Sequence, residues 1–225
     1  MLASESPSSI DELKARAQSI AGLSFQELAI QLNVAIPKNF KRQKGWTGQL
    51  IEKALGASAG SKPQQDFPDL GVELKTLPLS YSLSPLETTY VCYAPLMHLS
   101  GLTWERSNVR NKLQQVLWVP IEGEREIPVA ERLIGSAFFW RLEGAFDDML
   151  RQDWEELMDL ITLGKVETIT ARTGEYMQLR PKAADGSVVT DAVGEDGSII
   201  KTRPRGFYLR KNFTQKILQS AFQVA

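Results

Sequence analysis

The segment Gly71-Val-Glu-Leu-Lys-Thr-Leu77 constrains the fold more than any other part of the chain. Its apolar and polar residues alternate, and successive side chains of a strand point to opposite faces. This period of two predicts a half-buried strand. Val72 and Leu74 would then face the core, whereas Glu73 and Lys75 would share the other face.

The residues before this strand favour helices. Ser9–Glu12 and Ser24–Glu27 have the sequence of capping boxes, and each opens a segment with an apolar stripe. We expect the second helix to end at Pro37 and a third to cover residues 46–56. Residues 1–8 are expected to form a disordered tail.

The rest of the chain predicts a mixed sheet with helices outside it. The glycine-rich, polar stretch between residues 183 and 200 indicates a mobile loop or a hairpin. Helices come first and a sheet follows, so the fold class is α/β or α+β. Further strands are expected at 86–94, 113–121, 132–140, 175–182 and 206–211, and helices at 147–163 and 213–222.

Composition excludes several classes of site. Cys92 is the only cysteine and His98 the only histidine, which excludes an internal disulfide and argues against a Cys/His zinc site. No apolar run approaches the ~20 residues that span a bilayer, and Met1–Ile10 has no basic region of a secretory signal. These features predict a cytoplasmic protein whose acid–base chemistry uses carboxylates, lysines, tyrosines or a metal.

Asp66, Glu73 and Lys75 are the candidate catalytic residues. Asp66 lies where a loop enters the strand, so its carboxylate and that of Glu73 could ligate one divalent cation. Magnesium prefers such sites, with one or two carboxylates, waters and substrate phosphate oxygens. Lys75 could orient or deprotonate an attacking water. The pattern therefore predicts phosphodiester hydrolysis with Mg²⁺ as cofactor.

The tripeptide Glu-Leu-Lys is by itself uninformative, because it occurs twice. Glu12-Leu-Lys14 repeats it in a capped helix without a suitable aspartate upstream, and we interpret that copy as a solvated helical face. Spacing alone also assigns Glu52 to a helix surface without a role.

Charge is distributed unevenly, although the formal net charge is only −1. Residues 197–225 contain six basic and no acidic residues, whereas residues 143–159 contain seven acidic residues and one basic residue. One surface could attract polyanions, or both runs could be solvated faces. In the strand around Tyr208, we expect Phe207 and Leu209 to face the core and Tyr208 to face DNA or water.

The chain resembles the MutH family of methyl-directed mismatch repair endonucleases from about Gln18 to Phe222. The resemblance rests on long stretches, which include Lys44-Gly-Trp, Leu55-Gly-Ala-Ser-Ala-Gly-Ser-Lys62, Gln65-Asp-Phe, Leu70-Gly-Val-Glu-Leu-Lys-Thr76, Pro85-Leu-Glu-Thr-Thr89, Val116-Leu-Trp-Val-Pro-Ile-Glu-Gly123, Asp153-Trp-Glu-Glu-Leu-Met-Asp159, Arg180-Pro-Lys-Ala183 and Arg205-Gly-Phe-Tyr208.

The resemblance implies a restriction-endonuclease-like fold, a central mixed sheet flanked by helices, with two lobes around a DNA cleft. The whole chain would be one nuclease domain with two subdomains. The resemblance also implies nicking of the unmethylated strand at hemimethylated GATC, a monomeric state, and activation by a MutL-type ATPase after MutS finds a mismatch. By resemblance the catalytic residues are Asp66, Glu73, Lys75, Glu52 and Lys112, the metal ligands Asp66, Glu73 and Glu52, and the DNA-binding residues Lys44, Tyr90, Arg180, Pro181, Lys182 and Tyr208.

Two positions depart from the family pattern. Gln43 stands where the family usually has aspartate, and Tyr90 where it tends to have phenylalanine. Both departures bear on discrimination of methylated DNA and neither touches the metal-binding carboxylates. Two alternatives stay open: a dimeric type II restriction endonuclease that cuts both strands, and a DNA-binding module without catalysis. The acidic helix could be a partner surface or a solvated face.

Overall fold

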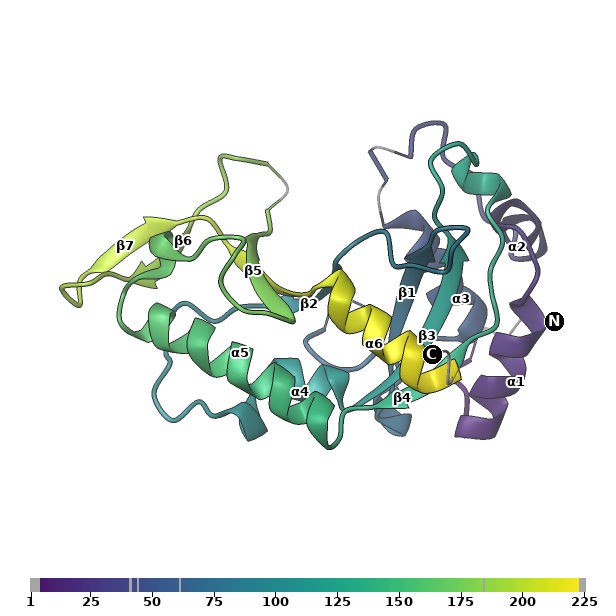
Figure 1. Cartoon of the computed structure of the whole chain (residues 1–225). Coiled ribbons are helices and arrows are strands. Elements are labelled where there is room, and N and C mark those ends of the chain that lie inside the picture. Colours follow the sequence, from purple (N-terminus) through teal and green to yellow (C-terminus); the bar gives the residue numbers. More distant parts are fainter. Residues whose placement is uncertain (1–4, 41, 44, 61, 184, 223–225) are drawn as a thin grey trace. The chain divides into compact units, whose positions relative to one another are not determined.

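The computed structural model describes residues 5–40, 42–43, 45–60, 62–183 and 185–222 (Figure 1). The chain forms two compact units. The first unit comprises residues 1–87 and 114–141, and the second comprises residues 88–113 and 142–225.

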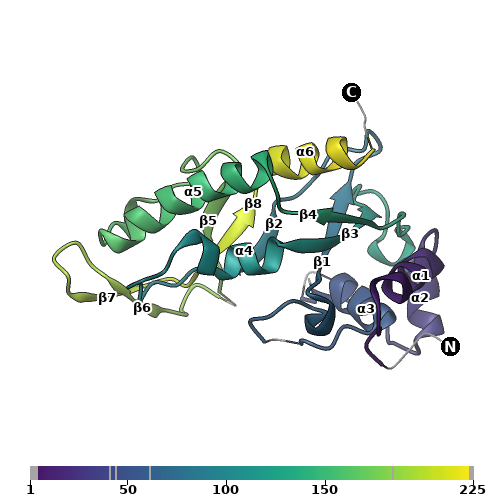
Figure 2. The ribbon, with the colours of Figure 1, turned by 90° about the horizontal axis from the view of Figure 1, so that it is seen from below.

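The first unit is a three-stranded mixed sheet covered on one face by helices. Strand β1 runs parallel to β3, and β3 runs antiparallel to β4. Figure 2 shows the three helices gathered on one side of the sheet. The elements are α1 (Ile10–Ile20), α2 (Phe25–Gln31), α3 (Trp46–Leu55), β1 (Glu73–Leu79), β3 (Gln115–Glu122) and β4 (Phe138–Arg141), with short 3₁₀ turns η1 (Pro68–Leu70) and η3 (Val129–Glu131).

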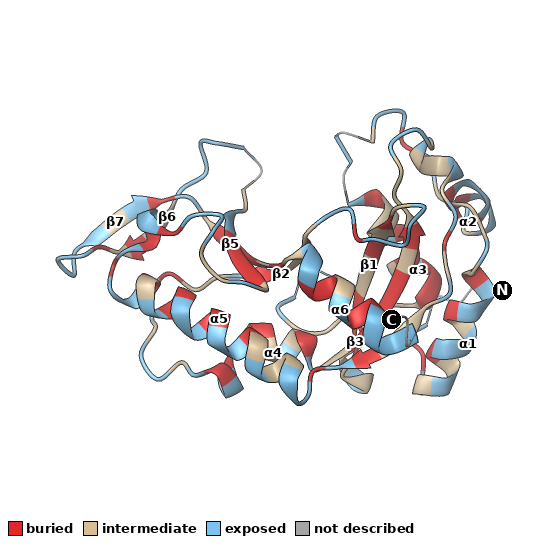
Figure 3. Ribbon diagram, in the orientation of Figure 1, coloured by how far each residue is buried: buried red, intermediate tan, exposed pale blue. Residues whose placement is uncertain are grey.

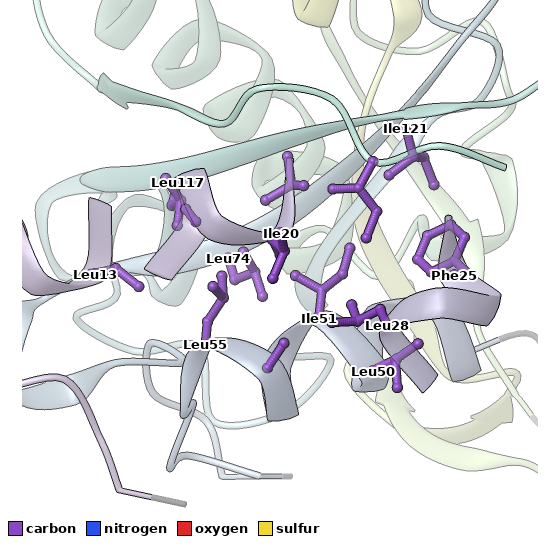
Figure 4. Close-up of a cluster of buried hydrophobic side chains, with 14 of the residues drawn as sticks. Leu13, Ile20, Phe25, Leu28, Leu50, Ile51, Leu55, Leu74, Leu117 and Ile121 are labelled. Carbon is purple, nitrogen blue, oxygen red and sulfur yellow. The ribbon is translucent and has the colours of Figure 1, made fainter. Parts of the chain in front are cut away.

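The core of this unit lies between the helices and the sheet. Side chains of all three helices meet Leu74 of β1 and Leu117 of β3 (Figure 4). Val72 and Leu74 lie in this core as the alternation predicted, and Leu117 is the register partner of Leu74, so the period-two pattern assigned the apolar face correctly. The helical contributions include Leu13, Ile20, Phe25, Leu28, Leu50, Ile51 and Leu55.

Helix α2 ends at Gln31, so the expected end at Pro37 was wrong. Asn33 adopts a left-handed conformation with φ of 50°. The N–H of Val34 donates to the carbonyl of Ala29 at 2.8 Å, and that of Asn33 to Ile30 at 3.1 Å. These two bonds form a Schellman motif, which ends the helix before proline can act.

The strand expected at 132–140 is shorter than predicted. Only β4 is regular, and Leu133 and Ile134 make isolated bridges to Ser24 and Ile121. The ladder breaks opposite Pro120 of β3, which has no N–H to return the bond that its carbonyl accepts from Gly135 at 2.8 Å.

The second unit contains an antiparallel sheet in the order β2-β8-β5 and a separate hairpin of β6 and β7. Helix α5 packs against β5. Figure 3 shows β5 largely buried and β7 largely exposed. The elements are β2 (Thr89–Tyr93), η2 (Trp104–Arg106), α4 (Asn108–Leu113), α5 (Ala145–Thr162), η4 (Val166–Thr168), β5 (Met177–Pro181), β6 (Thr190–Val193), β7 (Ile199–Thr202), β8 (Arg205–Leu209) and α6 (Lys211–Phe222).

Between residues 183 and 200 the hairpin alternative was the right one. Strands β6 and β7 pair in register, and Gly197 lies in the connecting turn with φ of 79°. Helix α4 was not expected from the sequence. None of the helices in the described parts of the chain is long and apolar enough to cross a membrane.

At the N-terminus, residues 1–4 lie outside the described residues. The part of the expected tail that is described makes defined contacts. The carbonyl of Glu5 accepts from Arg16 Nη1 at 2.7 Å, and Ser8 donates from its backbone and its hydroxyl to Glu12 at 2.8 Å.

Candidate functional site

A tight turn places Asp66 beside the start of β1. Phe67 and Val72 pair across the turn, with N···O distances of 2.9 Å and 3.2 Å. Gly71 has φ of 64°, a conformation that glycine adopts without the steric penalty of a Cβ atom. Asp66 Oδ2 then accepts a hydrogen bond from the N–H of Leu74 at 2.8 Å. Asp66 and Glu73 are thereby held at the same end of the strand.

Glu73 is buried, with only 1% of the residue exposed. Its Oε1 lies 2.5 Å from Nζ of Lys75, whose side chain is 13% exposed. The expectation of a half-buried strand was therefore wrong on the polar face, because the ion pair allows that face to be covered. A carboxylate at this depth needs a cationic partner, since an unpaired buried charge is strongly destabilising.

The donor set fits a hard divalent cation. The carboxylates of Asp66 and Glu73 supply oxygen ligands of the kind that Mg²⁺ and similar ions prefer. In the described ranges, no group of three or more His, Cys, Asp or Glu side chains is placed to hold a metal. Glu52, half-buried on α3, is therefore not gathered with the other two as a third ligand, and its role stays a prediction.

The second unit brings together four of the predicted DNA-binding residues, Tyr90, Arg180, Lys182 and Tyr208, which we call the aromatic–basic cluster. Tyr90 of β2 and Tyr208 of β8 are paired across the ladder, and their ring centroids are 5.3 Å apart. The Arg180 guanidinium lies 5.3 Å from the Tyr208 ring, and Lys182 Nζ lies 4.6 Å from the Tyr90 ring. Each cation thus stacks on one tyrosine.

Strand β8 has the two faces expected from its sequence. Phe207 and Leu209 are buried, whereas Tyr208 is half-buried. Burial raises the pKa of Tyr208, and the charge of nearby Arg180 partly opposes this rise. The phenol therefore keeps its proton at neutral pH and can donate a hydrogen bond.

Helix α5 fixes the start of β5, the strand that carries Arg180 and Pro181. Both carboxylate oxygens of Asp153 accept backbone N–H groups, from Glu175 at 2.9 Å, Tyr176 at 2.6 Å and Met177 at 2.7 Å. Three such bonds to one charge hold the strand firmly on the helix.

The role of Asp153 was not expected from the sequence, where this residue belongs to the acidic run of residues 143–159. The available signal was its spacing from Leu150 and Leu157, which places it on the buried stripe of α5. Asp147 of the same run is also engaged, with Trp104 and Arg110 each donating to it at 3.1 Å. The interpretation of the whole run as a solvated face therefore fails at these two residues.

The structure does not test two of the predicted site residues. Lys44 lies outside the described residues. Lys112 is half-buried in the last turn of α4, in the second unit, whereas the carboxylates belong to the first. Its catalytic assignment stays a prediction.

Comparison with known proteins identifies the family. The family profile described as DNA mismatch repair enzyme MutH matches residues 55–153. A DNA mismatch repair protein MutH of Vibrio cholerae serotype O1 is 58% identical over 213 residues, which cover 95% of this chain and 96% of the relative. The chain belongs to the MutH family.

Other MutH proteins match to a similar extent. That of Vibrio campbellii is 59% identical over 212 residues, covering 94% of each chain. That of Serratia proteamaculans is 57% identical over 218 residues, covering 97% of this chain and 96% of the relative.

Membership confirms the resemblance and the fold class, a mixed sheet flanked by helices as in restriction-endonuclease-like proteins. It makes the chain a DNA-binding mismatch repair enzyme of the endonuclease type, and MutH membership implies a divalent metal cofactor in general.

Proposed function

We propose that the chain is a Mg²⁺-dependent endonuclease that nicks the unmethylated strand of hemimethylated GATC sites in DNA mismatch repair. The observation that carries the proposal is the buried Glu73–Lys75 pair, with Asp66 fixed beside it by the Leu74 N–H. A carboxylate pair next to a lysine suits phosphodiester hydrolysis.

Each residue of this site has a distinct part in the reaction. Asp66 and Glu73 hold the cation, which when bound supplies Lewis-acid stabilisation of charge developing on the scissile phosphate. Lys75, kept in place by Glu73, donates a hydrogen bond that orients the attacking water. The water loses its proton to solvent as it attacks, and the leaving 3′ oxygen takes up a proton from solvent. The water oxygen bonds to phosphorus while the bond from phosphorus to the 3′ oxygen breaks. The products are a 5′ phosphate and a 3′ hydroxyl.

Three other predicted residues, Glu52, Lys112 and Lys44, have auxiliary roles in this proposal. Glu52 orients a metal-bound water or assists a second metal, and Lys112 acts as a further active-site lysine. Lys44 contacts the DNA backbone. These parts follow from the family resemblance at those positions.

In this proposal, the aromatic–basic cluster and Pro181 recognise the DNA sequence. The major groove of GATC displays a distinct set of donors and acceptors, and the N6-methyl group of adenine is visible there. Arg180 has the donor geometry for guanine, and the protonated Tyr208 hydroxyl can donate to a base or phosphate. Tyr90 keeps the ring of the usual phenylalanine and adds a hydroxyl near the methyl-sensing position.

In the cell, we propose that the protein is a cytoplasmic monomer of low activity. A MutL-type repair ATPase stimulates it after MutS has found a mismatch. A monomer is consistent with nicking, since one active centre cuts one strand.

The test is a nicking assay on covalently closed duplex DNA with one GATC site, in hemimethylated, fully methylated and unmethylated forms, with and without Mg²⁺. The proposal expects Mg²⁺-dependent nicks only in unmethylated strands, and no nicks with Asp66→Ala. Stable dimers that make double-strand breaks would instead identify a type II restriction enzyme. Binding without cutting, even with the activating ATPase present, would identify a DNA-binding module.

A further inference from the structure

We propose that Thr88 and Gly206 are positioning residues, which hold Arg180 and Tyr90 of the aromatic–basic cluster ready to meet DNA. The proposal rests on the DNA-reading part given to the cluster above. Neither residue needs to contact DNA itself, because each acts through its neighbour in the cluster.

Thr88 fixes the guanidinium of Arg180. Arg180 is exposed, and its Nη1 donates a hydrogen bond to Thr88 Oγ1 at 2.9 Å. The same guanidinium lies 5.3 Å from the Tyr208 ring. A free arginine side chain loses up to ~2 kcal/mol of rotamer entropy when it is ordered. The two contacts meet part of this cost before DNA binds, which is how preorganisation raises affinity and selectivity.

Gly206 leaves the space in which the Tyr90 ring lies. A Cβ atom at position 206 would approach Tyr90 Cε2 to 2.7 Å, and Tyr90 Cδ2 and the Cys92 carbonyl oxygen to 3.3 Å. The backbone of Gly206 is not left-handed, because its φ angle is not positive. Backbone freedom therefore does not explain this glycine, whereas close approach of an aromatic ring does.

The local structure of β2 supports the same interpretation. A register shift occurs between Tyr90 and Cys92, where the strand bulges against β8. Bulges bend a strand and redirect its side chains. Here the bulge and the missing side chain at Gly206 together bring the Tyr90 ring to its contacts with Tyr208 and Lys182.

The four cluster residues thus form one connected stack with a support at each end. Lys182 lies on Tyr90, Tyr90 packs on Tyr208, and Arg180 lies on Tyr208. Thr88 supports the Arg180 end and Gly206 the Tyr90 end. Loss of either support should leave the cluster side chains less ordered and so weaken the discrimination between GATC and altered sites. The chemistry of Asp66, Glu73 and Lys75 should stay intact.

The first experiment compares Thr88→Val with Thr88→Ser. Single-turnover nicking rates are measured on a GATC duplex and on duplexes with one base pair of the site changed. The valine variant removes the acceptor and keeps the shape, so the ratio of the two rates should fall by about 5–10-fold, as for loss of one ordinary hydrogen bond in an exposed position. The serine variant keeps the hydroxyl and should retain the wild-type ratio. Equal ratios for both variants would overturn the role of Thr88.

The second experiment combines Gly206→Ala with Tyr90→Leu. Gly206→Ala alone should lower the same ratio about 10-fold, the size expected for overpacking of one well-ordered side chain. In the Tyr90→Leu background it should have little further effect, because the ring that it displaces is gone. An equal loss in both backgrounds would mean that Gly206 serves the fold alone. Gly186→Ala is the matched control, since a Cβ atom there meets only Arg203 Nη2 at 3.8 Å.

Arg180→Ala separates the two proposals. If that change leaves site choice intact, the reading part assigned to Arg180 fails, and the positioning role of Thr88 fails with it. If Arg180→Ala relaxes site choice and Thr88→Val does not, only the positioning role is wrong. Thermal unfolding of each variant, together with the Thr88→Ser comparison, distinguishes misfolding from lost positioning.

Discussion

The two units hold their candidate functional groups in opposite environments. In the first unit, Glu73 is 1% exposed and lies 2.5 Å from the ammonium of Lys75. In the second, Arg180 is exposed and the two tyrosines of its cluster are half-buried, with cation–ring contacts of 4.6–5.3 Å.

Under the proposed function, this difference in burial corresponds to two kinds of task. Groups that stabilise charge in a transition state act best where water is excluded and where they cannot relax. Side chains that recognise a ligand must stay accessible to it. Weak contacts with neighbouring side chains then hold them in one conformation. We therefore expect substitutions at Asp66, Glu73 or Lys75 to abolish turnover and substitutions in the cluster to change site choice.

The largest expected effect comes from Glu73→Gln. The amide keeps the shape of the side chain but loses the charge that pairs with Lys75 and ligates the cation. Nicking should fall by about 10³-fold in single-turnover assays, a loss typical of removing one preorganised electrostatic group. DNA affinity measured without metal should change little, which would confirm that chemistry and reading are separate.

Glu12→Gln is the matched control, because Glu12-Leu-Lys14 repeats the tripeptide around Glu73. Hydrogen bonds from Ser8 and Arg16 lower the pKa of Glu12 to about 2, so this carboxylate is engaged on the surface of α1. Its loss should leave nicking unchanged. Nicking by Glu73→Gln within about tenfold of wild type would contradict the assignment.

Asp153→Asn should have the next largest effect, and on stability. The amide places an N–H₂ group against backbone N–H donors of residues 175–177, where the carboxylate accepted three bonds. The cost should be about 2–3 kcal/mol of unfolding free energy, which corresponds to a fall of roughly 5–10 °C in Tm.

Hydrogen exchange shows whether this loss stays within one unit. Amides of β5 should exchange faster in Asp153→Asn, and those of β1 should keep their wild-type rates. Glu156→Gln, on the exposed side of the same helix, is the control. Unchanged protection of β5 would mean that Asp153 does not anchor that strand.

Arg180→Ala tests the reading side of the comparison. Loss of one bidentate base contact should cost about 1–3 kcal/mol of discrimination, or roughly 10–100-fold in the ratio of nicking rates on GATC and altered sites. Arg203→Ala removes an exposed charge outside the cluster and should weaken binding to all sequences alike. If Arg180→Ala still nicks only GATC, Arg180 does not take part in sequence recognition.

Local patterns were sufficient to predict much of the first unit. The capping box at Ser24, the stripes of α1 and α2 and the alternation of β1 depend on neighbouring residues, and each was found where expected. At α1 only half of the expected box forms, because Ser9 caps the helix but the Glu12 side chain accepts from Ser8. The placement of Asp66 also followed from its entry into β1. Ends of elements were less predictable, because the Schellman turn at Asn33 and the interrupted ladder at Pro120 depend on hydrogen bonds that alternation does not encode.

Contacts between distant segments could not be predicted from these patterns. Alternation placed Glu73 on a polar face but could not reveal that this face is covered. The pairing of Tyr90 with Tyr208 requires the register of β2 on β8, including its bulge. The support of Arg180 by Thr88 depends on the same sheet.

The smallest expected effect is that of Glu167→Gln, which tests the ion pair between the exposed carboxylate of Glu167 and the buried guanidinium of Arg205. Glu167 of η4 accepts hydrogen bonds from Thr202 Oγ1 and, at 2.9 Å, from Arg205 Nη2. The hydrogen bond from Thr202 and the charge of Arg205 hold the pKa of Glu167 below its usual value of 4.5. A lowered pKa in the folded state adds stability above the unfolded pKa and loses it as pH falls through the folded value.

The Glu167 side chain is 63% exposed, so solvent screening should limit this contribution to less than about 1 kcal/mol. Urea denaturation at about pH 7 should show Glu167→Gln slightly less stable than wild type. The difference should shrink as pH falls below the unfolded pKa and disappear below the lowered folded pKa, where both forms are neutral. A difference that persists in acid would mean that Glu167 acts through packing. A pair with one exposed partner that contributes this little, beside the Glu73–Lys75 pair in which both side chains are largely covered, would show that burial of the carboxylate sets how much a charge pair matters in this protein.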